Sequence, residues 1–133
     1  MRNMMITAAI MAMMAGSVQA KPHLRDVKSI DGSLLAVALA NEIRNHCSNI
    51  SPRLFKALRF VNGLRDKAIK MGYTDAEIDA YRKSDVEKER LKSEGYAYLA
   101  ANGVITGQPE TYCALGRAEI EKSSQIGALL RVN

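Results

Sequence analysis

An uncharged apolar run near the start of this 133-residue chain indicates which segment is removed and which part remains to fold. The run extends from Met4 to Ala15. A basic residue, Arg2, precedes it and Val18-Gln19-Ala20 follows it. A basic start, a short apolar segment and small residues before a cleavage point are typical of a secretory signal peptide. A membrane anchor would need about twenty apolar residues, more than this run supplies. We therefore predict export, with cleavage after Ala20.

Cleavage would leave residues 21–133 as a single domain, in the periplasm or outside the cell. Six of the 7 methionines belong to the removed segment, and the formal net charge falls from +5 to +4 because Arg2 is its only charged residue. A domain of this size buries one modest core. It is too short for a two-domain dinucleotide-binding enzyme or a barrel enzyme.

The two cysteines, Cys47 and Cys113, predict a disulfide, because a small even count in an exported protein usually forms one. A bridge closing a loop of about 66 residues would stabilise the fold by roughly 4 kcal/mol. The alternative is a reactive thiol, since His46 precedes Cys47 and would lower its pKa. Adjacent helix residues point about 100° apart, however, and no C-x-x-C motif is present. We favour the structural disulfide.

Helix signals follow one another along residues 21–133, and no stretch alternates with a period of two. The sequence therefore predicts an all-α fold: a small bundle of four to five helices closed by one disulfide. The expected helices are Leu34 to about His46 after a start at Asp31-Gly32-Ser33, Ser51-Pro52 to Met71, Asp75 to Lys83, Asp85 to Ala101, and Gln108-Pro109-Glu110 to about Leu130. The third and fourth would form one bent helix if the break between them were only a kink.

Capping residues and glycines support these boundaries. Thr74 with Glu77 forms a capping-box pattern, and Ser84 with Glu87 repeats it. Gly116 and Gly127 lie in the last predicted helix, where glycine costs about 1 kcal/mol relative to alanine. We interpret them as positions of close helix approach rather than as a flexible hinge.

The second predicted helix carries an arginine among apolar residues. Its expected core face consists of Leu54, Leu58, Val61 and Ala68, and Arg65 falls on the same arc. An arginine on a core face needs a partner or has to extend to the edge. We predict an ion pair with Glu42, and the alternative is an anion-binding arginine at a cleft.

Glu42 and His46 lie four residues apart and therefore share a helix face. This pair would suit a general base or half of a metal site. The only other histidine is His23, near the start of the mature chain, so we expect neither a metal nor a cofactor. We interpret Glu42 and His46 as an ordinary pair at the rim of the bundle.

Five basic side chains predict a contact with an acidic surface. No aromatic side chains suited to base stacking are interleaved with them, which argues against nucleic acid. An unknown protein partner or an anionic membrane surface fits better, and a merely solvated face is the alternative. The five residues are Arg53, Lys56, Arg59, Lys67 and Lys70. The mixed charges of Asp85–Lys92 are interpreted as a solubilising surface.

Several segments together resemble a known family. These are Leu34-Leu35-Ala36-Val37 leading to Glu42-Ile43 and Cys47, Gly72-Tyr73-Thr74-Asp75-Ala76-Glu77-Ile78, Tyr112-Cys113-Ala114-Leu115-Gly116-Arg117-Ala118-Glu119-Ile120, and the closing Gln125-Ile126-Gly127 and Leu129-Leu130-Arg131. They resemble an uncharacterised family of short secreted alphaproteobacterial proteins. The resemblance brings no catalytic residues. It implies a periplasmic accessory role at the outer face of a respiratory membrane complex, the NADH–quinone oxidoreductase.

No nucleophile elbow, phosphate-binding loop, zinc-protease motif or haem-attachment motif occurs in the sequence. We therefore predict a non-enzymatic accessory or interaction protein. The alternative function is a small-ligand or anion carrier that uses a cleft near Arg65, Glu42 and His46.

Overall fold

The computed structural model describes residues 20–133, so the predicted signal peptide lies outside the described residues except for Ala20. Residues 20–133 form five longer α-helices, a short sixth helix, one 3-10 turn (η1) and a small antiparallel sheet. This confirms the predicted all-α class. The elements are η1 (Leu24–Asp26), α1 (Lys28–His46), β1 (Ile50–Pro52), α2 (Leu54–Lys70), α3 (Asp75–Lys83), α4 (Asp85–Ala101), α5 (Pro109–Lys122), α6 (Gln125–Ala128) and β2 (Leu130–Val132).

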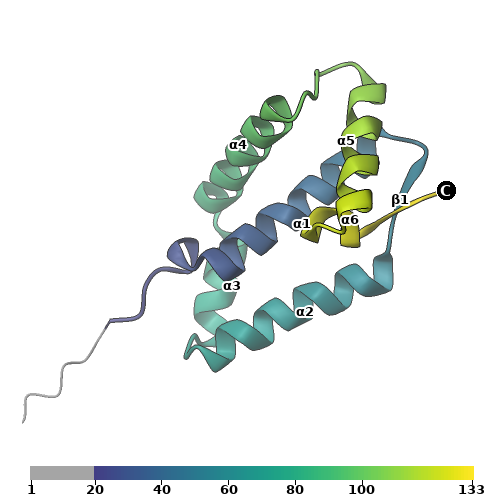
Figure 1. Ribbon diagram of the computed structural model, residues 1–133. Helices are drawn as coiled ribbons and strands as arrows, with labels where there is room; N and C mark the ends of the chain where they lie inside the picture. The colour runs from purple at the N-terminus through teal and green to yellow at the C-terminus, as the bar shows by residue number, and fades with distance from the viewer. Residues whose placement is uncertain (1–19) are drawn as a thin grey trace, which may run out of the picture.

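Helix α1 runs through the middle of the molecule, with α2 on one side, α4 on the other and α5 beside its C-terminal half (Figure 1). Leu39 and Ile43 of α1 lie in the main core with Leu99 of α4 and Leu115 of α5. A second, smaller cluster at the N-terminal end of α1 contains Leu24, Val27, Ile30, Ala68 and Tyr73. Because α1 contributes to both clusters, the other helices are positioned relative to it.

The predicted disulfide is confirmed. Cys47, the residue after α1, is bonded to Cys113 in the first half of α5, with 5.1 Å between the two Cα atoms. Both cysteines are buried. The bridge therefore ties the central helix to the helix that packs across its end.

The C-terminal region differs from the predicted single helix. Helix α5 ends at Lys122, and Ser123 adopts a left-handed conformation with φ of 53°. The chain then turns back, so that a Cβ on Gly127 would lie 1.9 Å from the Glu119 carbonyl oxygen. Gly127 therefore allows α6 to pack directly on α5, which is the close approach predicted for it. Gly116 lies in α5 and Gly127 in α6, whereas the sequence predicted one helix for both.

A two-stranded sheet replaces the predicted start of the second helix. Ser51 pairs with Arg131 in an antiparallel register, and the Arg53 backbone N–H donates to the Leu129 carbonyl at 2.8 Å. Ser51 and Pro52 therefore lie in β1, and the prediction that they open α2 is wrong. No local signal marks so short a strand, because its partner lies at the other end of the chain.

The predicted core face of α2 is also wrong. Leu54 and Leu58 are 70% and 61% exposed, and of that set only Ala68 is buried. The side of α2 that packs against the main core instead carries Ala57 and Phe60. The apolar arc of this helix is wider than the side that packs, because it also carries the exposed Leu54, Phe55 and Leu58, so periodicity alone does not specify which part of the arc faces inward.

The two predicted caps are present, and they separate α3 from α4. Thr74 and Glu77 form a complete capping box, in which the Thr74 hydroxyl accepts from the Glu77 N–H and the Glu77 carboxylate accepts from the Thr74 N–H. Ser84 caps α4 by accepting from the Glu87 N–H. Helix α1 begins at Lys28, earlier than predicted, because Leu24 and Val27 are buried and hold the preceding turn against the fold.

Candidate functional site

The N-terminal half of α2 exposes three large apolar side chains, named here the apolar triplet: Leu54, Phe55 and Leu58. Phe55 is 85% exposed. Single exposed apolar residues are normal on protein surfaces, but a cluster within about one turn marks an interaction surface. Figure 1 shows α2 at the edge of the molecule, with α1 on only one of its sides.

Four exposed cations lie beside the apolar triplet. Arg53, Lys56 and Arg59 come from the start of α2, and Arg131 comes from β2. Together with Pro52, Leu54 and Phe55 they line a shallow hollow of about 500 Å³, named here the four-cation hollow. No carboxylate lines it. Among the described residues, none of the four cations makes an ion pair.

The small sheet brings Arg131 to this place. Because Ser51 pairs with Arg131 and the Arg53 N–H binds the Leu129 carbonyl, the end of the chain is fixed beside the first turn of α2. Sequence reasoning found Arg53, Lys56 and Arg59 but missed Arg131. The sequence around a single arginine near the C-terminus does not indicate which residues lie beside it in the fold. Lys67 and Lys70, also predicted for this surface, are exposed in the last turn of α2 and do not line the hollow.

The predicted Arg65–Glu42 ion pair does not form. Arg65 Nη2 lies 2.6 Å from the Asp75 carboxylate at the start of α3, and both side chains are more than half exposed. The prediction assumed that Arg65 lay on a core face, whereas the side of α2 that carries Leu58 and Arg65 points outward. Such an exposed pair contributes at most about 1 kcal/mol to stability.

Glu42 and His46 do pair with each other. His46 Nδ1 lies 2.9 Å from the Glu42 carbonyl oxygen and 3.5 Å from its carboxylate. The His46 ring also stacks on Tyr112, with 4.3 Å between the ring centroids. His46 therefore covers the buried Tyr112 beside the disulfide, a packing arrangement at the rim of the bundle.

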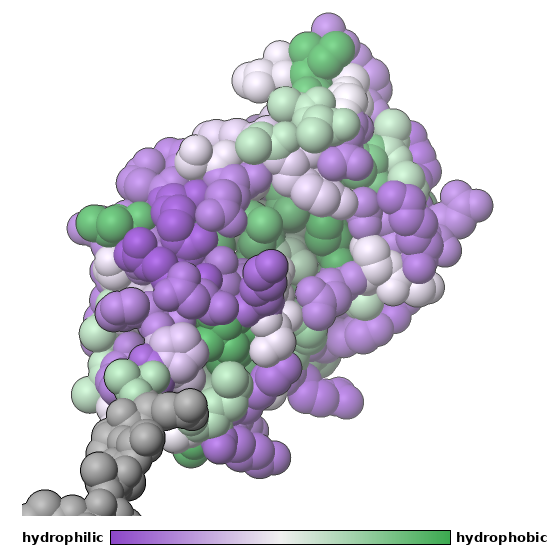
Figure 2. Space-filling model, turned by 60° about the vertical axis from the view of Figure 1, so that its left-hand side comes forward, coloured by the Kyte–Doolittle hydropathy of each residue, from purple (hydrophilic) through white to green (hydrophobic). Residues whose placement is uncertain are grey.

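These three predicted residues do not converge on one cleft. Arg65 lines a groove of about 740 Å³ between α1, α2, α3 and α4, whereas Glu42 lines a neighbouring hollow between α1 and α4 and does not line the groove itself. The groove has apolar walls that include Leu34, Val61 and Leu91. On the side of the molecule that carries α3 and α4, Figure 2 shows apolar surface recessed between hydrophilic side chains.

A network of charged groups, missed in the sequence, ties α1, α3 and α4 together. Arg90 of α4 donates to the Asp31 carboxylate of α1, to Glu87 at 2.9 Å and to the Tyr81 hydroxyl at 3.0 Å. Tyr81 in turn donates to Asp31. Glu87 also accepts from Arg25 of η1. Asp85–Lys92 is therefore not only a solubilising surface, because Glu87 is buried and Arg90 is largely covered.

The environment of this network shifts its pKa values. Burial and the hydrogen bond to Asp31 raise the pKa of Tyr81 well above its ordinary value. Burial alone would raise the pKa of Glu87, but hydrogen bonds from Arg90 and Arg25 lower it below its usual range. Hydrogen bonding to Asp31 raises the pKa of Arg90. At neutral pH Tyr81 therefore stays neutral while Glu87 and Arg90 stay charged, which suits a structural network.

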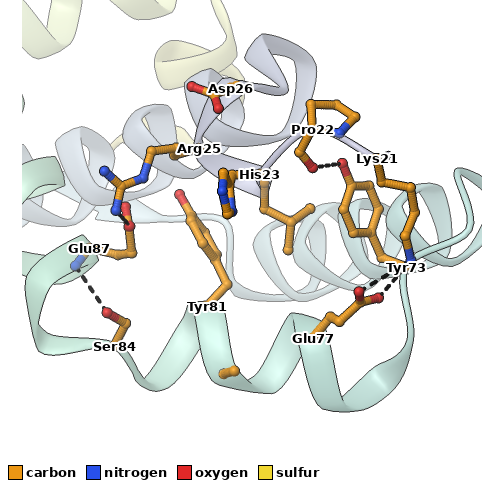
Figure 3. A pocket seen from close by; sticks show the side chains of 12 residues that line it. Lys21, Pro22, His23, Arg25, Asp26, Tyr73, Glu77, Tyr81, Ser84 and Glu87 are labelled. Carbon is orange, nitrogen blue, oxygen red and sulfur yellow. Dashed lines mark hydrogen bonds and ion pairs between the residues drawn. The ribbon is translucent and has the colours of Figure 1, made fainter. Parts of the chain in front are cut away.

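The same region forms a cavity of about 860 Å³ between residues 21–26 and α3 (Figure 3). At one end Arg25 points to Glu87. At the other end Lys21 reaches Glu77 at 2.9 Å, and the Tyr73 hydroxyl donates to the Pro22 carbonyl. Five of the polar side chains that line the cavity make these contacts, which hold the N-terminal segment to α4 at one end and beside α3 at the other: Lys21, Arg25, Tyr73, Glu77 and Glu87.

Residues 20–133 contain no group of three or more histidine, cysteine or acidic side chains arranged to hold a metal ion. In the same range no helix has the length and apolar character needed to cross a bilayer.

Comparison with known proteins places the chain in a family. The model of a family of unknown function, DUF5333, matches residues 22–131. The chain belongs to this family. The DUF5333 match includes both cysteines, the apolar triplet and all four cations of the hollow. No curated protein and no solved structure matches the chain.

Proposed function

We propose that this DUF5333 protein is a non-enzymatic interaction protein of the cell envelope that docks on an acidic surface through the start of α2. The observation that carries the proposal is the apolar triplet, exposed beside four cations that have no partner within the described residues. Burial of one such apolar side chain contributes roughly 2 kcal/mol, so exposing three together favours a bound state.

The proposal includes a periplasmic location, supported by the signal-peptide pattern of residues 1–20. It also suits the accessory role at a respiratory membrane complex that the family resemblance implies. A protein held at a membrane surface by one helix would leave its remaining surface free for such a complex.

Co-sedimentation with native envelope membranes, which contain both lipids and proteins, tests the docking proposal. We expect the processed protein to sediment with them and the Phe55→Ser/Leu58→Ser variant to lose at least tenfold in binding. The matched control is Val86→Ser/Ile105→Ser, which removes two apolar side chains that are 69% and 53% exposed in other parts of the surface. A wild-type protein that stays in the supernatant, or equal losses in both variants, would overturn the proposal.

The groove between α1, α2, α3 and α4 favours a second candidate function, a carrier of a small apolar ligand. Its volume of about 740 Å³ lies within the range of ligand pockets, and its walls are largely aliphatic. Arg65 at its edge is the only one of the three residues predicted for a carrier cleft that lines it. Titration with a fluorescent fatty acid tests this candidate, and Leu34→Trp, which fills the groove, is expected to abolish binding.

A further inference from the structure

We infer that the four-cation hollow binds the phosphate headgroup of an anionic phospholipid, while the apolar triplet enters the acyl region beneath it. This inference rests on the proposed docking through α2 and names its partner as the lipid bilayer itself.

The charges of the hollow favour a phosphate. Arg53, Arg59 and Arg131 offer planar guanidinium groups, which bind phosphate oxygens in pairs, and Lys56 adds a fourth positive charge. Other cations without an ion pair in residues 20–133, such as Arg44 and Arg117, do not line the hollow, so what distinguishes it is that four such cations lie together. Four like charges gathered without a counterion repel one another, so an anion placed between them lowers the free energy of the site.

The apolar triplet distinguishes a lipid from a free phosphate. Leu54 and Phe55 line the hollow itself, so an occupant has to meet positive charge and apolar surface together. A phosphate ion in water would leave Phe55 as exposed as before. An anionic bilayer supplies both a negative charge for the cations and an apolar region for the triplet, since its phosphates lie directly above its acyl chains.

The backbone on both sides of the hollow is held by hydrogen bonds within the fold. The Ser51–Arg131 strand pairing and the Arg53 N–H bond to Leu129, at 2.8 Å, fix both sides of it. The disulfide at Cys47 lies three residues before β1 and anchors the same segment to α5. A backbone that is already held has less conformational freedom to lose on binding, which favours recognition of one headgroup over loose attraction to charge.

Vesicle binding tests the inference, with phosphatidylcholine vesicles compared against vesicles that contain phosphatidylglycerol. We expect binding to the anionic vesicles only, and a loss of about fivefold for each cation removed in Arg53→Gln and Arg131→Gln. The matched control is Lys67→Gln/Lys70→Gln, which removes two charges from the other end of α2. It is expected to change binding much less than Arg53→Gln/Arg131→Gln.

Insertion has its own readout, because the natural chain contains no tryptophan. In a Phe55→Trp variant the indole emission is expected to shift to the blue with anionic vesicles and to be quenched by brominated acyl chains. A Val86→Trp reporter on α4 is expected to show neither effect. Emission from Phe55→Trp that stays unchanged on binding would contradict entry into the acyl region.

Three other outcomes would overturn the inference. Equal losses in the two double variants would mean diffuse attraction along α2 rather than a headgroup site. Inhibition by inorganic phosphate, at the concentration of the vesicle phosphate, would mean that a free anion is the ligand. Binding to native membranes without binding to lipid vesicles would identify a protein partner, and would leave the proposed docking function in place.

Discussion

Arg90 of α4 donates two hydrogen bonds to Asp31 of α1, from Nη2 to Oδ1 at 2.5 Å and from Nη1 to Oδ2 at 3.1 Å. Asp31 is 8% exposed, and the Arg90 side chain is 23% exposed. Two parallel N–H···O bonds to one carboxylate are the strongest geometry for such a pair. This pair joins α1 to α4.

Replacing Arg90 with methionine is expected to lower the free energy of unfolding by about 3 kcal/mol, because it leaves the buried Asp31 carboxylate without its positively charged partner. Urea unfolding measures the change. The matched control is Arg82→Met, whose side chain is 68% exposed and whose partner lies 3.4 Å away, with an expected loss below about 1 kcal/mol. Similar losses in both variants would show that the Asp31 pair is no stronger than a surface pair.

Replacing either of two helical glycines with alanine should change the stability of the protein, in opposite directions for the two positions. A Cβ on Gly116 would lie 2.4 Å from Ile50 Cδ1 and 2.8 Å from Ile43 Cγ2, whereas on Gly95 its nearest neighbours lie at 3.9 Å. Gly116→Ala is expected to destabilise by about 1–2 kcal/mol through overpacking. Gly95→Ala is expected to stabilise by up to about 1 kcal/mol through helix propensity. Thermal unfolding of both variants checks this, and a stabilising Gly116→Ala would contradict the close approach.

Local chemistry in the sequence was sufficient to predict the caps and the disulfide. The Thr74 hydroxyl and the Glu77 carboxylate act within one turn, so their roles are visible in four consecutive residues. Cys47 and Cys113 had no other thiol to pair with. These features needed no knowledge of how distant segments meet.

Pairings between distant segments were not predictable. Asp31 matched the pattern of a helix start, yet its carboxylate binds Arg90, 59 residues away. Arg131 reaches the hollow beside Arg53 only because a three-residue strand folds back on β1. The predicted inward face of α2 was wrong for the same reason. The apolar residues of this helix permit several inward faces, and contacts at its start select one of them.

Loss of the disulfide is expected to lower the free energy of unfolding by about 4 kcal/mol, since the bridge closes a loop with a sequence separation of 66 residues. Cys47→Ser/Cys113→Ser tests this in urea, without strong reductant in either sample. Reduction of the wild-type protein provides the control and should give a similar loss. Unchanged stability in the variant would mean that other contacts alone hold α1 to α5.

The processed protein is expected to begin at Lys21. The contacts that hold this end to α3 come from the Lys21 side chain and the Pro22 carbonyl, so they remain after cleavage. Mass spectrometry of the exported protein should give residues 21–133, two hydrogens lighter than the reduced chain. A product that keeps residues 1–20 would contradict the predicted signal peptide.

Stability should fall in acid, and Glu119 should account for part of the loss. Burial alone would raise the pKa of Glu119. Hydrogen bonds from Ser124 and Tyr98 and the charge of Lys122 lower the pKa by more, so that its net value lies below the ordinary 4.5. A carboxyl group whose pKa is lower in the folded state stabilises the fold above its unfolded pKa. That stability is lost as the pH falls through the folded value.

The matched variant is Glu119→Gln, which keeps a hydrogen-bond acceptor for the Tyr98 hydroxyl, 2.8 Å away in the wild type, but cannot ionise. At about pH 7 the variant is expected to be less stable than the wild type. The two unfolding free energies should begin to approach each other near pH 4.5 and converge only below the folded pKa of Glu119, which is lower than 4.5, because only there is the wild-type carboxyl neutral in the folded state as well. Urea unfolding across this pH range measures both curves. If the curves stayed parallel, the acid sensitivity would have to arise from other carboxylates, with Glu87 the first to substitute, because its pKa is lowered in the same direction.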